Sequence, residues 1–122
     1  MATSQATKNK WAGSAWEMAL LKGLREEGFE VERLHLTGQH DEGDLAIRHG
    51  EDDWTLIEAK AGRFLPSSFI QQAEVEAKNF AKSRKLDEFD VDGIVVVKRR
   101  GKPWSQAYVL TTLDAYLGFP DE

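Results

Sequence analysis

The chain has 122 residues, enough for one domain with a single core and too few for two. Its composition, 41% hydrophobic and 30% charged, is that of a folded protein, and no apolar run approaches the roughly 20 residues of a membrane-spanning helix. The absence of cysteine excludes disulfides, thiolate zinc sites and cysteine nucleophiles, and it fits a reducing, intracellular location. We expect a flexible arm over residues 1–10, which lack the apolar core of a secretory signal, and a single domain over 11–122.

Charge is distributed unevenly along the chain, whose net charge is −5. Between Glu26 and Glu58 there are eleven acidic and two basic residues, so the rest of the chain is net positive. Outside that block, basic side chains gather in three clusters: Lys8 and Lys10; Lys78, Lys82, Arg84 and Lys85; and Lys98, Arg99, Arg100 and Lys102. Such clusters are candidate contacts for nucleic-acid phosphates, and solvated helix faces and turns are the alternative interpretation.

The first predicted element is a helix over residues 14–27. Ser14 and Glu17 have the spacing of a capping box, an apolar stripe follows at helical spacing, and Gly28 ends the pattern. Apolar residues that alternate with charged ones then predict a strand over 29–36.

Two further strands are expected to form a hairpin. The polar segment 37–43 predicts a loop, and residues 44–48 predict a strand. Residues 50–53 predict a turn, after which residues 54–60 predict the partner strand.

The second half of the chain adds a long helix, two strands and a short helix. A serine and a glutamine in capping-box spacing open a helix over 68–85, and the β-branched run at 93–97 predicts a strand buried on both faces. A strand over 107–110 and a short helix over 112–117, capped by Thr112, complete the order. This order predicts an α/β fold in which helices flank a mixed sheet.

Asp44 at the start of the hairpin, with Glu58 and Lys60 at its end, is the most informative pattern in the sequence. Because side chains alternate across a strand, Glu58 and Lys60 point to the same side. In the register that the turn implies, Asp44 lies near Glu58, and two such carboxylates are stable chiefly with a divalent cation between them. Oxygen ligands favour Mg²⁺ or Mn²⁺, which can hold a water for attack on a phosphodiester, while Lys60 can orient that water or neutralise developing charge.

Gly43-Asp44 followed by Glu58-Ala-Lys60 resembles the signature of the PD-(D/E)xK nucleases, with glycine where the family often has proline. The segment 13–17 and the Gly28-Phe29 pair extend the resemblance, over about residues 11–112, to archaeal-type Holliday junction resolvases and their viral relatives. The resemblance implies a restriction-endonuclease-like αβββαβ core and a Mg²⁺-dependent endodeoxyribonuclease inside a prokaryotic or virus-infected cell. It also implies a homodimer that cuts opposed strands of a four-way DNA junction.

The resemblance implies roles for single residues as well. Glu17 would be a third acidic metal ligand, Gln71 would lie near the site, and Thr37 is the nearest candidate for the hydroxyl residue of the family's mobile loop. We further hypothesise that an apolar group after the third strand forms part of the dimer interface: Phe64, Leu65, Phe69 and Ile70.

The expected DNA contacts are basic residues outside the acidic block: Lys8, Lys10, Arg63, Lys78, Lys82, Arg84, Lys85, Arg99 and Arg100. Trp11 and Trp104, each beside basic residues, are candidates for stacking on bases.

Two alternative functions stay open at this point. The first is another PD-(D/E)xK nuclease that acts on flaps, ends or duplex DNA, and paired nicks in opposed strands of a junction would distinguish a resolvase from it. The second is a non-catalytic DNA-binding module with a structural acidic cluster, which would not bind Mg²⁺ near Asp44 and Glu58. The acidic block disfavours this module, because it repels phosphates unless a cation is recruited.

Overall fold

The computed structural model describes residues 5–34 and 43–118, with side chains from residue 13 onward. The helices are α1 (Gln5–Glu26), α2 (Pro66–Ser83) and α3 (Leu113–Leu117), with short 3-10 helices η1 (Glu88–Asp90) and η2 (Trp104–Gln106). The strands are β1 (Glu30–Arg33), β2 (Leu45–Gly50), β3 (Asp53–Lys60), β4 (Val91–Val97) and β5 (Tyr108–Leu110). None of the helices in the described ranges is long and apolar enough to cross a membrane.

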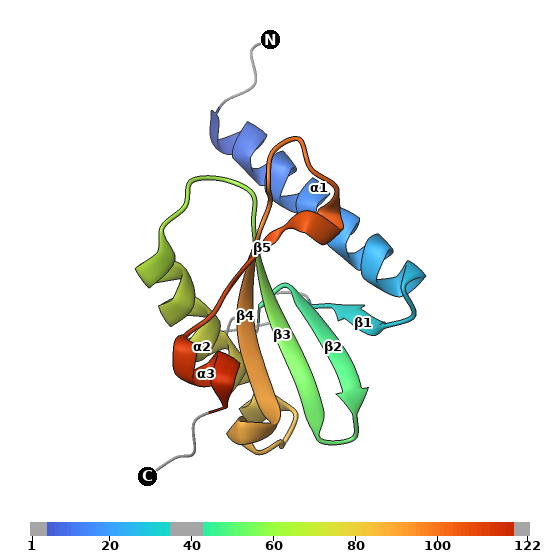
Figure 1. Ribbon diagram of the computed structural model, residues 1–122, viewed down its shortest axis with the longest axis vertical. Helices are drawn as coiled ribbons and strands as arrows, with labels where there is room; N and C mark the ends of the chain where they lie inside the picture. The colour runs from blue at the N-terminus through green and yellow to red at the C-terminus, as the bar shows by residue number, and fades with distance from the viewer. Residues whose placement is uncertain (1–4, 35–42, 119–122) are drawn as a thin grey trace.

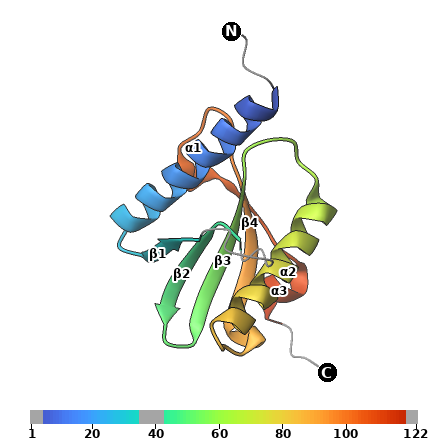
Figure 2. The same cartoon turned by 180° about the vertical axis from the view of Figure 1, so that it is seen from behind.

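The strands form one mixed sheet in the order β1-β2-β3-β4-β5 (Figure 1). The β1–β2, β2–β3 and β4–β5 pairs are antiparallel, whereas β3 and β4 are parallel. A parallel pair needs a long crossover connection, and α2 supplies it (Figure 2). The predicted α/β fold with a mixed sheet and flanking helices is therefore confirmed.

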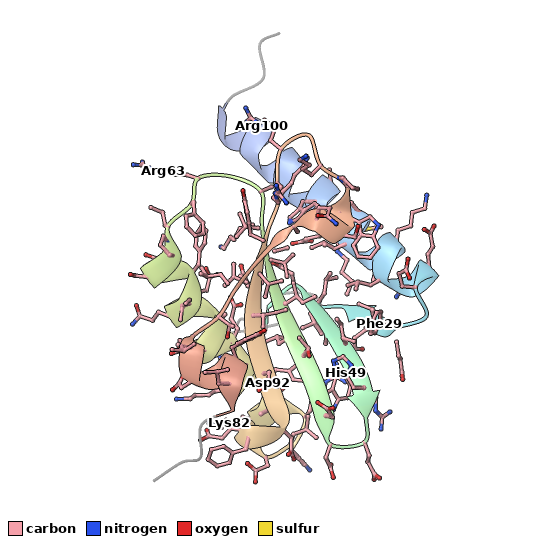
Figure 3. The ribbon with its side chains drawn as sticks, viewed as in Figure 1. Phe29, His49, Arg63, Lys82, Asp92 and Arg100 are labelled. Atoms are coloured by element: carbon pink, nitrogen blue, oxygen red, sulfur yellow. The ribbon has the colours of Figure 1, made fainter. Side chains whose placement is uncertain are left out.

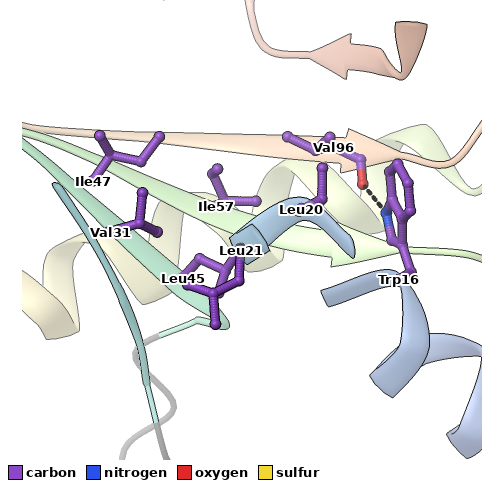
Figure 4. Close-up of a cluster of buried hydrophobic side chains, with 8 residues drawn as sticks. All are labelled: Trp16, Leu20, Leu21, Val31, Leu45, Ile47, Ile57 and Val96. Carbon is purple, nitrogen blue, oxygen red and sulfur yellow. Dashed lines mark hydrogen bonds between the residues drawn. The ribbon is translucent and has the colours of Figure 1, made fainter. Parts of the chain in front are cut away.

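One face of the sheet packs against α1. The cluster consists of the buried residues drawn in Figure 4: Trp16, Leu20, Leu21, Val31, Leu45, Ile47, Ile57 and Val96. The indole Nε1–H of Trp16 donates a hydrogen bond to the Val96 carbonyl at 3.2 Å, which satisfies the one polar group of that side chain and links α1 to β4.

The other face of the sheet packs against α2. Its two clusters bury the residues Ala46, Leu56, Phe69, Ala73, Ala77, Phe80, Ala81, Val91, Val95 and Val97. Because side chains alternate along β3, Glu58 and Lys60 lie on the same face as Leu56 and therefore face α2.

The long helices begin earlier than the capping patterns predict. Helix α1 starts at Gln5, so Ser14 lies inside the helix rather than at its start, and residues 5–10 are helical. Helix α2 starts at Pro66, with Leu65 at the N-cap and no side-chain cap. Proline suits a first helical turn because its fixed φ is already helical and its missing N–H would have no partner there. The predicted Thr112 cap of α3 is confirmed, since its hydroxyl accepts from the Ala115 N–H.

We expect Gly93→Ala to lower the free energy of unfolding by about 1–3 kcal/mol. A Cβ at this position of β4 would lie 2.6 Å from the Ala73 carbonyl oxygen of α2, so the helix would have to move. Gly62→Ala is the matched control, since nothing lies within 4 Å of a Cβ there. Equal urea midpoints for the two variants would contradict the close packing of α2 on β4.

Candidate active site

The hairpin places Asp44 beside the end of β3. The register pairs Leu45 with Ile57, and the Asp44 N–H donates to the Ile57 carbonyl at 3.1 Å. The Asp44 carboxylate also contacts β3, where its Oδ2 accepts from the Ala59 N–H at 2.8 Å. The Asp44 carboxylate is thereby held against Ala59, the residue that follows Glu58, as the hairpin pattern predicts.

Glu58 is a buried carboxylate, 5% exposed. Its Oε1 lies 3.1 Å from Lys60 Nζ and accepts from Gln72 Nε2 at 3.2 Å. Within the described part of the chain, no group donates to its Oε2. The Lys60 ammonium also lies 5.1 Å from the centroid of the Phe69 ring. The carboxylate is therefore fixed through one oxygen only.

Gln72 and Glu76 of α2 belong to the site, although the sequence pattern singles out Gln71. The Gln71 side chain is exposed, whereas Gln72 donates to Glu58 and, at 2.9 Å, to Oε1 of Glu76, which is itself buried. The signal that could have found them is the apolar stripe of α2, because residues 72 and 76 lie three and seven positions after the buried Phe69, on the same side of the helix.

Glu17 reaches the site from α1. Its Oε2 pairs with the Arg33 guanidinium of β1 at 3.0 Å, and its carboxyl also shares a hydrogen bond with Asp44. Glu17 therefore does not form the capping box that its spacing from Ser14 predicts. The site draws residues from α1, β1, β3, α2 and the start of β2.

Burial, the hydrogen bond with Glu17 and the negative charge of Glu58 raise the pKa of Asp44 to about 8. The hydrogen bond from the Ala59 N–H acts in the opposite direction but does not outweigh them. In the absence of a cation, Asp44 is therefore largely protonated at neutral pH. A divalent cation would favour the charged form that burial disfavours.

The donors at this site suit a divalent cation. Asp44 and Glu58 offer carboxylate oxygens, the kind of ligand that Mg²⁺ and Mn²⁺ prefer, and the Oε2 of Glu58 is buried without a donor in the described part of the chain. As the side chains lie, the described residues contain no group of three or more acidic or histidine side chains close enough to hold an ion.

Gly43 adopts a conformation that proline cannot. Its φ is +97°, whereas the proline ring holds φ near −65°. A Cβ here would also lie 3.1 Å from the Leu56 side chain and 3.4 Å from Oε2 of Glu76. The glycine before Asp44 is thus favoured by its positive φ and by the close approach of the Leu56 side chain of β3.

The predicted DNA contacts fall into separate regions. Figure 3 shows Arg63 and Arg100 at one end of the molecule and Lys82 at the other. The end that carries Arg63 and Arg100 is also the end where the site lies. The chain just before Arg100 pairs with Lys60 of the site, because the Lys98 N–H donates to the Lys60 carbonyl at 2.9 Å.

Several other candidates have structural partners or lie outside the described side chains. Arg84 binds Glu32 at 2.6 Å, and its guanidinium lies 5.0 Å from the centre of the Phe80 ring. Arg99 donates to the Gln106 carbonyl. Lys78 and Lys85 are exposed. Four candidates lie outside the described side chains: Lys8, Lys10, Trp11 and Thr37.

Two apolar candidates pack inside the domain. Phe69, a predicted interface residue, is buried in the cluster under α2, while Phe64 and Leu65 are exposed and Ile70 is half-buried. Trp104 is a predicted candidate for stacking on bases, but its ring packs closely on α1 at a glycine where a Cβ would lie 2.2 Å from the indole. The glycine is Gly23, and a side chain at this position of α1 would collide with the half-buried Trp104 ring.

No protein-family model matches the chain, and no curated protein matches it either. Among solved structures, the chain is similar to Archaeoglobus fulgidus Hjc, a Holliday junction resolvase from an archaeal hyperthermophile. The TM-score is 0.51 and the sequence identity is 19%, over 80% of this chain and 70% of that chain. At this identity the likeness shows the fold alone, an α/β fold with a mixed sheet between helices, as the sequence predicts.

The raised pKa of Asp44 predicts a fold that becomes less stable as the pH rises when no divalent cation is present. The folded state holds the Asp44 proton up to about pH 8, whereas the unfolded chain releases it near the ordinary value of 3.8. The stabilisation is therefore complete below pH 4 and is lost progressively as the pH rises toward 8, with a slope of up to about 1.4 kcal/mol per pH unit for one proton. Thermal unfolding in EDTA from pH 5 to pH 9 measures this loss.

Asp44→Asn should flatten that pH dependence, because asparagine cannot titrate. Asp92→Asn, which changes an exposed carboxylate on β4, should retain the wild-type slope. The same slope in Asp44→Asn and wild type would show that Asp44 titrates near its ordinary pKa.

Proposed function

We propose that this chain is a metal-dependent endonuclease that hydrolyses phosphodiester bonds in DNA and resolves four-way junctions inside the cell. The observation that carries the proposal is the buried Oε2 of Glu58, which has no donor in the described part of the chain and lies beside Asp44 at the end of the hairpin. The fold that the chain shares with a Holliday junction resolvase supports the choice of substrate.

Asp44 and Glu58, with Glu17, would hold Mg²⁺, and Mn²⁺ would substitute for it. When bound, the ion supplies an activated water and offsets negative charge on the oxygens of the phosphodiester. A carboxylate binds a cation in its ionised form, so a bound ion would stabilise the charge on Asp44 that burial disfavours.

Lys60 would stabilise the charge that develops on the phosphate. Its ammonium is half-buried, paired with Glu58 and packed on the Phe69 ring, so little rearrangement is needed for it to face an anion. A positive charge held in place before the reaction stabilises a transition state more than a freely moving one.

DNA would approach at the end of the sheet that carries Lys60, where Arg63 and Arg100 also lie (Figure 3). Two such chains would form a homodimer, since two opposed strands of a junction require two active sites. The exposed Phe64 and Leu65 lie close to the site and would contribute to that interface.

The direct test uses strand-labelled four-way junctions and matching linear duplex, with Mg²⁺ or EDTA, and resolves the products on a denaturing gel. We expect paired nicks in opposed strands of the junction, in Mg²⁺ only, and little cutting of duplex. Equal cutting of flaps or duplex would retain a nuclease and refute the junction preference. Tight binding without cutting in any divalent metal would instead indicate a binding module.

We expect Asp44→Asn and Glu58→Gln each to reduce cleavage by at least about 100-fold, because a bound metal contributes several kcal/mol to catalysis. Junction binding should improve in Glu58→Gln, which removes a negative charge from the site, and should persist in Asp44→Asn, because asparagine has the shape of the protonated Asp44 carboxyl. Asp92→Asn is the matched control and should cleave normally. Substantial turnover in either site variant would refute the assignment of these two residues as metal ligands.

We also expect the double variant Arg63→Ala/Arg100→Ala to bind junctions more weakly and with a smaller salt dependence. The slope of log affinity against log salt should fall by about one for each phosphate that the variant no longer neutralises. Lys82→Ala, at the opposite end of the molecule, should leave the slope unchanged. A larger effect of Lys82→Ala would instead place the path of the DNA at the end of the molecule that carries Lys82.

A further inference from the structure

Glu76 is a buried carboxylate to which the proposed mechanism gives no role. It lies on α2 and is 2% exposed, less than Glu58. Burying a carboxylate is costly unless its surroundings compensate for the lost water, so such residues are rarely retained at random. Its Oε1 accepts a hydrogen bond from Gln72, one helical turn earlier.

Gln72 bridges two carboxylates with one nitrogen. Its Nε2 donates to Oε1 of Glu76 at 2.9 Å and to Oε1 of Glu58 at 3.2 Å. An amide nitrogen has two N–H groups and no acceptor, whereas the amide oxygen would repel either carboxylate. Glu76 therefore holds the nitrogen end of the Gln72 amide in place, where it also donates to Glu58.

This bridge restricts how the Glu58 carboxylate can rotate. The terminal torsion of a glutamate is broad, so nothing within the side chain itself fixes which oxygen points where. Here Gln72 and Lys60 both contact the same oxygen, Oε1. The other oxygen, Oε2, is left buried without a donor in the described part of the chain.

Glu76 also lies against the backbone that precedes Asp44. A Cβ built on Gly43 would be 3.4 Å from Oε2 of Glu76. A single carboxylate of α2 thus lies near Gly43 and, through Gln72, is linked to Glu58. These two points adjoin Asp44 and Glu58, two of the three acidic residues that would hold the metal.

We propose that Glu76 is a positioning residue: it orients the Gln72 amide, which fixes Glu58 so that Oε2 is available to a divalent cation. This inference rests on the proposed metal-dependent function. Groups that orient metal ligands typically change metal affinity by about 10- to 100-fold when they are removed.

The test is binding of Mn²⁺ to the full chain, measured as the decrease of the free Mn²⁺ signal in electron paramagnetic resonance. Gln72→Met and Glu76→Met remove the bridge at similar side-chain length, and Gln71→Met is the matched control on the exposed neighbour. We expect each bridge variant to raise the Kd for Mn²⁺ by about 10-fold or more, with no change for the control. The double variant should be no weaker than Gln72→Met alone, because Glu76 acts through Gln72.

Thermal unfolding in EDTA separates positioning from folding. Replacing a buried charge with an apolar side chain is often neutral or stabilising, so Glu76→Met should keep its thermal stability while it loses Mn²⁺ affinity. Unchanged Mn²⁺ affinity in Glu76→Met would overturn the proposal. Fully additive losses in the double variant would also overturn it, since Glu76 would then act independently of Gln72.

Junction cleavage by the same proteins distinguishes this inference from the proposed function. If wild type binds Mn²⁺, the bridge variants bind it weakly and no DNA is cut, the nuclease function fails and the positioning role stands. If wild type binds no Mn²⁺, the positioning role fails whatever the DNA assay shows.

Discussion

The closeness of two carboxylates, Asp44 and Glu58, is the constraint to which the rest of the site responds. Strand pairing imposes it, because the register that sets Leu45 opposite Ile57 leaves Asp44 beside the end of β3. Neighbouring groups reduce the repulsion between these two carboxylates. The Ala59 N–H donates to Asp44, while the Lys60 ammonium and the Gln72 amide contact Glu58.

These contacts do not fully compensate for the burial and repulsion of the two carboxylates. One oxygen of Glu58 is buried without a donor in the described part of the chain, and the pKa of Asp44 rises to about 8. Both features reduce the stability of an empty, fully ionised site. Natural proteins tolerate such local conflicts mainly where function requires them, and a divalent cation would resolve both of these at once.

The hairpin and its acidic pattern could be predicted because they depend on local rules. Turn residues and period-two alternation are enough to place Asp44 near Glu58 and to put Lys60 on the same face. The Thr112 cap likewise depends only on neighbours within one turn. The start of α1 could not be predicted, because residues 5–12 have no apolar periodicity and Gly13, a poor helix former, separates them from the apolar stripe.

The choice between Gln71 and Gln72 depends on tertiary structure. Neighbouring helical residues point about 100° apart, so the rotation of α2 on the sheet decides which glutamine reaches Glu58. That rotation is set by the packing of Phe69 and Ala73 against Val95 and Val97. The same packing buries Glu76, a charged residue that composition alone would assign to the surface.

The central claim is that these carboxylates form a site for a divalent cation. A crystal soaked in Mn²⁺ tests it most directly, because anomalous scattering locates the ion without reference to activity. We predict a single strong peak within bonding distance of Glu58 Oε2 and the Asp44 carboxylate, with the hydrogen bond between Asp44 and Glu17 broken. An absence of density there at saturating Mn²⁺, with Asp44 still bonded to Glu17, would contradict the claim.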